Sequence, residues 1–272
     1  MAGSNLRIAD YHVHTEMCGH ARGTVEEMVE SAIEKGFARI GIADHMPLLY
    51  GTNPHLAMAP EKMPEYVETV LEVKERYRGR IEVLLGIEAD YHGPTQAERV
   101  EILGKYPFDY IIGSVHILGD WIFDSPMEVE RYDEIDLDEF YLDYFREVLA
   151  LVETGVYDVV GHADLAKKFD KRASIDLTSR YRKVLFAMKR RGVCFEVNTA
   201  GLRWPVQEIY PEPSFVAIGA ELGVPVTTGS DAHSPEDVGR DFDKALELIR
   251  GAGYKSVATF EARRMTPVRL TD

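Results

Sequence analysis

The chain has 272 residues, with 31 Lys and Arg against 46 Asp and Glu, so its formal net charge is −15. This length suits a single domain, and a hydrophobic content of 45% is typical of a folded chain. The acidic balance excludes an extended nucleic acid or an anionic membrane surface as the partner. Two cysteines cannot build a disulfide framework, and no signal peptide or membrane-spanning segment is evident. We therefore expect a cytoplasmic protein with one domain over 1–272.

Short β-rich apolar segments recur along the chain, with amphipathic stretches between most of them. The segments expected to form strands are 6–11, 38–43, 81–87, 108–113, 156–160, 193–197 and 224–228, followed by a last β-like segment near 256–261. Seven alternating units predict a parallel sheet that is closed, or nearly closed, on itself.

The helices are predicted from capping residues and apolar spacing. Thr24 and Glu27 form a capping-box pattern in front of the first helix, which ends before Gly36. Similar spacing predicts helices at 138–154, 177–191 and 235–250. No Gly/Ser-rich or Pro-rich linker divides the chain, which favours a single domain.

Side chains that can bind a metal or a substrate follow each predicted strand. In chain order they include His12, His14, His20, Asp44, His45, Glu88, His116, His162, Asn198, Asp231 and His233. The carboxyl ends of the strands of a parallel α/β barrel form one rim, so these side chains are expected to converge in space. His12 and His14 are two apart on an extended segment, so both point to the same side and can hold one cation.

This set of imidazoles and carboxylates indicates a metal centre. It is too large for one tetrahedral zinc and suits two or three divalent ions. The donors are compatible with zinc, the first choice, and with manganese or iron. Cys18 is expected to be a packed thiol, His55 and His92 receive no role, and Asp44 either orients His45 or caps the following loop.

The order of these motifs resembles the polymerase and histidinol phosphatase (PHP) family. HxH, DH, a mid-chain Glu, two single His and a final DxH occur here in the family's order. The resemblance implies a distorted (β/α)7 barrel with three divalent metal ions at the carboxyl ends of its strands. It also implies the ligands: His12, His14, Glu88 and Asp231 for one ion, the bridging Glu88 with His116 and His162 for a second, and His20, His45 and His233 for the third.

Three segments, 113–124, 161–169 and 196–211, resemble the histidinol-phosphate phosphatase branch of that family. The likeness covers nearly the whole chain, and it implies hydrolysis of L-histidinol phosphate, a small phosphate ester, to L-histidinol and phosphate in histidine biosynthesis. A changed specificity would arise at loop residues such as Asp120 and Trp121.

The hypothesis for the mechanism is direct attack on phosphorus by a hydroxide that bridges the metals. It is favoured because metal ligands abound and no nucleophile motif is evident. The expected catalytic residues are Glu88, Asp231 and Arg203. Arg203 is the first choice for binding the phosphate because its planar guanidinium suits phosphate oxygens, and Lys167 and Lys168 are the second choice.

Other function classes remain open at this point. The nearest is a PHP phosphoesterase that acts on another small phosphate monoester or on a nucleotide. A metal-dependent amidohydrolase would also place HxH after the first strand, but it would carry a bridging Lys where Glu88 stands. A non-catalytic domain that keeps the barrel often loses ligands, whereas the full set is present here.

Overall fold

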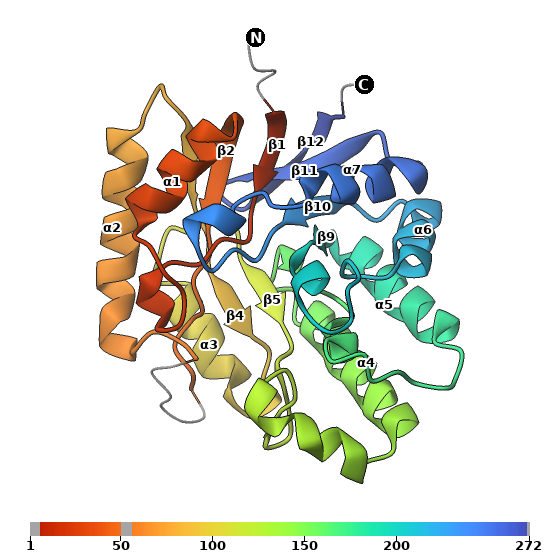
Figure 1. Cartoon of the computed structure of the whole chain (residues 1–272). Helices are drawn as coiled ribbons and strands as arrows, with labels where there is room; N and C mark the ends of the chain where they lie inside the picture. The colour runs from red at the N-terminus through yellow and green to blue at the C-terminus, as the bar shows by residue number, and fades with distance from the viewer. Residues whose placement is uncertain (1–5, 50–55, 271–272) are drawn as a thin grey trace.

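A computed structural model describes residues 6–49 and 56–270, and its strands form two parallel sheets (Figure 1). The first sheet has the order β1-β2-β3, with β1 at Leu6–Asp10, β2 at Phe37–Ile42 and β3 at Glu82–Leu85. The second has the order β10-β9-β8-β5-β4, with β4 at Glu88–Asp90, β5 at Ile112–Ser114, β8 at Val159–Val160, β9 at Cys194–Asn198 and β10 at Val226–Gly229. All neighbouring strands in both sheets pair in parallel.

Backbone hydrogen bonds link the two sheets at two places. Tyr11 N, just after β1, donates to Thr228 O of β10 at 3.1 Å. At the second place Glu88 N of β4 donates to Asp44 O, just after β2, at 3.0 Å. The carboxyl ends of strands from the two sheets therefore lie next to each other.

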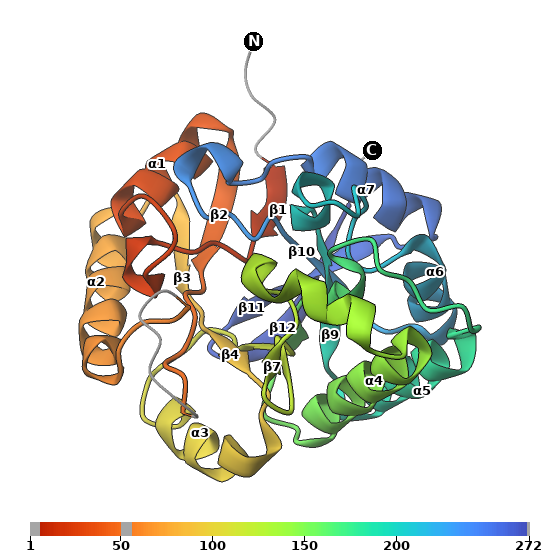
Figure 2. The same ribbon diagram turned by 60° about the horizontal axis from the view of Figure 1, so that its bottom comes forward.

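Seven α-helices are present within the described ranges. They lie around the strands, as Figure 2 shows. They are α1 at Val25–Glu34, α2 at Met63–Arg76, α3 at Gln96–Leu103, α4 at Leu137–Glu153, α5 at Thr178–Arg191, α6 at Pro213–Leu222 and α7 at Phe242–Gly251. The predicted capping box is present at α1, because Thr24 Oγ1 accepts from Glu27 N and the Glu27 carboxylate accepts from Thr24 N. None of the helices in the described part of the chain has the length and apolar character that a membrane crossing requires.

A hairpin packs beneath the strands at the end away from their carboxyl termini. It consists of β11 at Ser256–Glu261 and β12 at Arg264–Arg269, which pair in antiparallel fashion. Phe260 of β11 makes edge contact with Tyr11, and Tyr110 lies 5.1 Å from Tyr11 between ring centroids. These buried aromatic rings fill the space between the strands and the hairpin. A second small hairpin joins β6 at Ile117–Leu118 to β7 at Trp121–Ile122.

The structure corrects two element boundaries. The predicted strand 81–87 ends at Leu85, and Glu88 opens a separate strand instead of following one. The predicted helix 235–250 begins only at Phe242, because the chain makes a single 3-10 turn at Pro235–Asp237 and then adopts left-handed backbone at Gly239 and Asp241. Left-handed residues interrupt the hydrogen-bond pattern of an α-helix.

We expect Gly41→Ala to destabilise the fold. A Cβ at Gly41 would lie 2.1 Å from the Tyr110 hydroxyl, which is buried and donates to Tyr11 O at 2.6 Å. Overpacking of this kind costs about 1–3 kcal/mol in the free energy of unfolding, measured by urea denaturation. Gly251→Ala is the matched control, since a Cβ added there, on the surface of α7, would meet no atom within 4 Å, and it should change stability by less than about 0.5 kcal/mol. Equal effects of the two substitutions would contradict the prediction.

Candidate metal centre and active site

Glu88, the first residue of β4, lies at the centre of a group of imidazoles. Its side chain is 1% exposed. Oε2 lies 2.8 Å from His45 Nδ1 and 3.3 Å from His12 Nε2, while Oε1 lies 3.1 Å from His162 Nε2. Ser114 Oγ at the end of β5 donates to Oε1 at 2.6 Å. One carboxylate thus contacts residues from four different strand ends.

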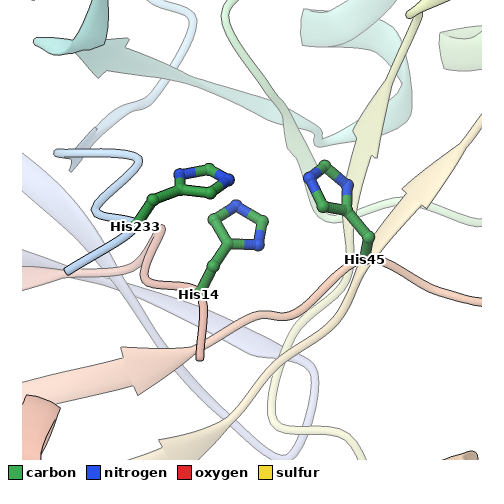
Figure 3. A group of neighbouring side chains, drawn as sticks. All are labelled: His14, His45 and His233. Carbon is green, nitrogen blue, oxygen red and sulfur yellow. The ribbon is translucent and has the colours of Figure 1, made fainter. Parts of the chain in front are cut away.

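Asp231 forms a second centre in the same group. Its Oδ1 lies 3.2 Å from His14 Nε2 and 3.5 Å from His233 Nδ1. The ring of His14 lies 4.4 Å from that of His45 and 4.3 Å from that of His233, measured between centroids, and Figure 3 shows these three rings converging from separate segments. His233 Nε2 in turn lies 2.9 Å from His20 Nε2.

His116 completes the group, with its Nε2 3.3 Å from His162 Nε2. The structure therefore brings together all nine residues predicted as ligands, which are His12, His14, His20, His45, Glu88, His116, His162, Asp231 and His233. Two triplets among them place one donor atom each within 4.8 Å of the others, a spacing that could hold a metal ion: His14, His45 and His233, and His12, His14 and Asp231.

Local backbone pairing explains how segments far apart in sequence meet. His14 N donates to Ala232 O at 2.8 Å, and Ala232 N donates to His12 O at 3.1 Å, so the HxH and DxH motifs pair with each other. Gly229 permits this approach, because a Cβ there would lie 2.8 Å from His12 Cβ and 2.4 Å from Glu196 Oε2.

Two buried carboxylates behind the imidazoles were not predicted. His12 Nδ1 lies 2.9 and 3.0 Å from the two oxygens of Glu196, and His116 Nδ1 contacts Asp90 Oδ1. Such partners fix the ring orientation and leave the other nitrogen free to face the centre. A sequence signal for both exists: Glu196 is a charge inside the apolar strand β9, and Asp90 follows Glu88 at the two-residue spacing of one strand face.

Within the described residues, the Asp44 carboxylate accepts hydrogen bonds from Thr15 and not from His45 or the backbone that follows it. The distances to Thr15 N and Thr15 Oγ1 are both 2.5 Å, and the carboxylate lies 3.8 Å from His14 Nδ1. Asp44 therefore braces the turn that follows the HxH motif.

The carboxylates of the group hold negative charge in the interior. Burial raises the pKa of Glu88, but His45, His12 and His116 outweigh it and hold the pKa well below its usual range. Burial likewise opposes protonation of His12, yet the charges of Glu196, Glu88 and Asp231 raise its pKa well above the ordinary value. The buried negative charge of these carboxylates must therefore be offset by nearby positive charge, and either protons or metal cations can supply it.

Three other imidazoles of the group have lowered pKa values, which favours their neutral form. Burial, together with His233 and His45, lowers the pKa of His14 well below its ordinary value, and burial with His45 and His233 lowers that of His20 to about 3. Burial also lowers the pKa of His233. Neutral imidazole is the form that binds metal ions.

Five of these histidines line a cavity of about 410 Å³: His20, His45, His116, His162 and His233. Arg203 and Lys168 also line this cavity. Arg203 Nη2 donates to Ser230 O at 2.6 Å and to Asp231 O at 3.2 Å, whereas its buried Nη1 has no partner in the described part of the chain. Lys168 Nζ donates to Asp124 Oδ2 at 3.1 Å.

The structure does not bring Lys167 to this cavity. Its Nζ lies 2.9 Å from Asp164 Oδ2, donates to Ile209 O at 2.9 Å and to Glu208 Oε2 at 3.3 Å, and it lines a neighbouring cavity instead. Asp120 and Trp121, expected near the substrate, also lie outside the cavity lining.

Cys18 and the two histidines without a predicted role, His55 and His92, complete the comparison with the sequence predictions. Cys18 is a free, buried thiol, but its Sγ lies 3.7 Å from His20 Nδ1, closer to the metal-binding group than expected. His92 Nδ1 lies 3.1 Å from Thr95 Oγ1, and His55 is outside the described residues.

Comparison with known proteins agrees with this arrangement. The family model described as PHP domain matches residues 10–200, and the PHP-associated model matches residues 217–241. The chain is 40% identical to a probable histidinol-phosphatase of Deinococcus radiodurans, over 96% of this chain and 99% of that one. It is 31% identical to the histidinol-phosphatase of Bacillus subtilis, over 88% and 98% of the two chains.

A solved structure shares the fold. The histidinol phosphate phosphatase of Lactococcus lactis, crystallised with zinc, L-histidinol and phosphate, superposes with a TM-score of 0.82 at 24% identity, over 96% of this chain and 99% of that one. The family model alone matches more than half of the chain. The protein described here therefore belongs to the PHP domain family.

Proposed function

We propose that this protein is a metal-dependent phosphomonoesterase that hydrolyses L-histidinol phosphate to L-histidinol and phosphate. The observation that carries the proposal is the convergence of seven imidazoles with Glu88 and Asp231. Six of these nine residues line the cavity: His20, His45, His116, His162, Asp231 and His233. Its relatives named histidinol-phosphatase extend over nearly the whole chain, and the Lactococcus lactis enzyme binds zinc together with L-histidinol and phosphate.

The proposed cofactor is zinc, in a cluster of three ions. The proposed ligands are His12, His14, Glu88 and Asp231 for the first ion, Glu88, His116 and His162 for the second, and His20, His45 and His233 for the third. Support comes from His12 Nε2, His14 Nε2 and Glu88 Oε2, which are buried and accept or donate no hydrogen bond within the described ranges. When bound, such ions neutralise phosphoryl oxygens and make a bound water acidic.

The chain's own cationic side chains complete the proposed phosphate site. Arg203 is fixed to the backbone of Ser230 and Asp231 through Nη2, so its guanidinium is oriented before the substrate arrives. Its Nη1 can then donate to a phosphoryl oxygen. Lys168 lines the same cavity and is the second proposed phosphate binder, whereas Lys167 is already committed to Asp164 and Glu208.

For the fold, we propose that the two sheets form one distorted (β/α)7 barrel and that 1–272 is a single domain. The hydrogen bond from Tyr11 N to Thr228 O supports closure between β1 and β10. Because β3 and β4 follow each other with two residues between them, they count as one strand of the barrel, which makes seven.

We expect the zinc-loaded protein to hydrolyse L-histidinol phosphate with a higher kcat/KM than any other ester in a panel of small phosphate monoesters and mononucleotides. Phosphate release measures the rates. A chelator should abolish the activity and added zinc should restore it, because the proposed chemistry depends on the ions. If another monoester had a clearly higher kcat/KM, the proposed substrate would be wrong, whereas the reaction class, hydrolysis of a phosphate monoester, would still hold.

Glu196→Gln should weaken zinc binding about 10- to 100-fold, because the amide removes the negative charge that holds His12. Competition with a chromogenic chelator measures the affinity, and circular dichroism checks the fold. Asp120→Asn, at an exposed carboxylate paired with Arg131 away from the cavity, is the control and should bind zinc as the wild type does. Wild-type affinity in the Glu196 variant would show that this carboxylate does not position His12.

Arg203→Lys should lower kcat/KM for the phosphate ester about 10- to 100-fold, because an ammonium group cannot keep both backbone contacts and also reach the phosphate. Steady-state kinetics measure the change. Arg182→Lys, at an exposed ion pair with Glu221, is the control. If the two variants had the same kcat/KM, Arg203 would have no part in phosphate binding.

A further inference from the structure

Asp124 is one of two carboxylates that line the cavity outside the nine proposed metal ligands. It lies shortly after β7, and its side chain is 20% exposed. Lys168 Nζ donates to its Oδ2 at 3.1 Å, and no residue in 6–49 or 56–270 donates to its Oδ1. Lys168 is held in turn by the ring of Trp204, whose centroid lies 4.0 Å from Nζ. Asp124 therefore presents one oxygen that has room for another donor.

Asp124 lines the same cavity as His116 and His162, two of the proposed metal ligands, and its ion pair with Lys168 favours the ionised carboxylate. His116 and His162 belong to the group around Glu88. A substrate whose phosphate meets these histidines would thus have its neighbouring atoms within reach of Asp124.

Asp237 is the other carboxylate that lines the cavity outside the nine proposed ligands, and its oxygens are occupied. Oδ1 accepts from Arg240 Nη1 at 2.7 Å, and Oδ2 accepts from Ser234 Oγ at 3.1 Å. Of the two, Asp124 is the one with an oxygen that accepts no hydrogen bond from the described residues.

The proposed substrate carries two opposite charges close together. Its ammonium group is attached to the carbon next to the ester methylene, so it lies only three bonds from the ester oxygen. Lys168 and Asp124 are also an adjacent pair of opposite charges. If the two pairs of charges lie side by side in opposite directions, the phosphate is beside Lys168 and the ammonium is beside Asp124. Each charge of the substrate then contacts an opposite charge of the protein.

We propose that Asp124 accepts a hydrogen bond from the ammonium group of the substrate. This contact makes the site selective for phosphate esters that carry an amine on the carbon next to the ester methylene. This inference rests on the proposed function. The apolar part of the wall, formed by Ile122, Leu165 and Trp204, is left for the imidazole ring. The site would then recognise the phosphate, the amine and the imidazole ring of the substrate through three different sets of side chains.

The test compares two esters that differ only in the amine: L-histidinol phosphate and 3-(imidazol-4-yl)propyl phosphate. The quantity measured is the ratio of their kcat/KM values, with the zinc-loaded protein. The wild type should prefer the amine, and Asp124→Asn should reduce that ratio about 10- to 100-fold, as expected for loss of a charged hydrogen bond. Asp237→Asn, at the occupied carboxylate, is the matched control and should keep the wild-type ratio.

The outcomes separate the inference from the proposed function. A wild type that hydrolyses other phosphate monoesters better than L-histidinol phosphate would refute the function. A wild type that prefers L-histidinol phosphate, with an unchanged ratio in Asp124→Asn, would refute only the role of Asp124, and so would an equal loss of both activities. If circular dichroism shows that Asp124→Asn is unfolded, Asp124→Ser is measured by the same criteria.

Discussion

The buried charge of Glu88 is the constraint on which the rest of the site depends. A carboxylate that is 1% exposed cannot remain ionised without compensation, because removing it from water costs several kcal/mol. Its two oxygens are therefore surrounded by ring nitrogens of His12, His45 and His162 and by the hydroxyl of Ser114. These partners come from different strand ends, so the strands must meet with their carboxyl termini together for the charge to be tolerated.

The same charge explains why further carboxylates stand behind the imidazoles. With Glu88 alone, His12 would be held on one side only, whereas Glu196 contacts its Nδ1 and fixes the ring between two anions. Asp90 does the same for His116. This alternation of carboxylate, imidazole and carboxylate leaves an excess of negative charge in the interior. Divalent cations at the centre would neutralise that excess and would use the ring nitrogens that face it.

The sequence predicts the inner part of this arrangement, because His12 and Asp231 follow strands whose carboxyl ends share one rim. Glu88 is predicted to follow a strand in the same way, whereas it is the first residue of β4 and reaches the group from there. The outer carboxylates could not, since Glu196 contacts a histidine 184 positions away and a strand interior gives no hint of its neighbour. Boundaries failed where backbone conformation decides them, as at the left-handed Asp241 before α7.

Adjacent positions can also serve different sites, which spacing alone cannot reveal. Lys167 and Lys168 end a single 3-10 turn, so their side chains leave the backbone in different directions and line two different cavities. Only Lys168 joins Arg203 in the cavity beside the histidines. Under the proposed function, a protein with a net charge of −15 could thus bind a dianion, because the phosphate would meet Arg203, Lys168 and the proposed ions in one cavity, while salt screens the acidic surface beyond.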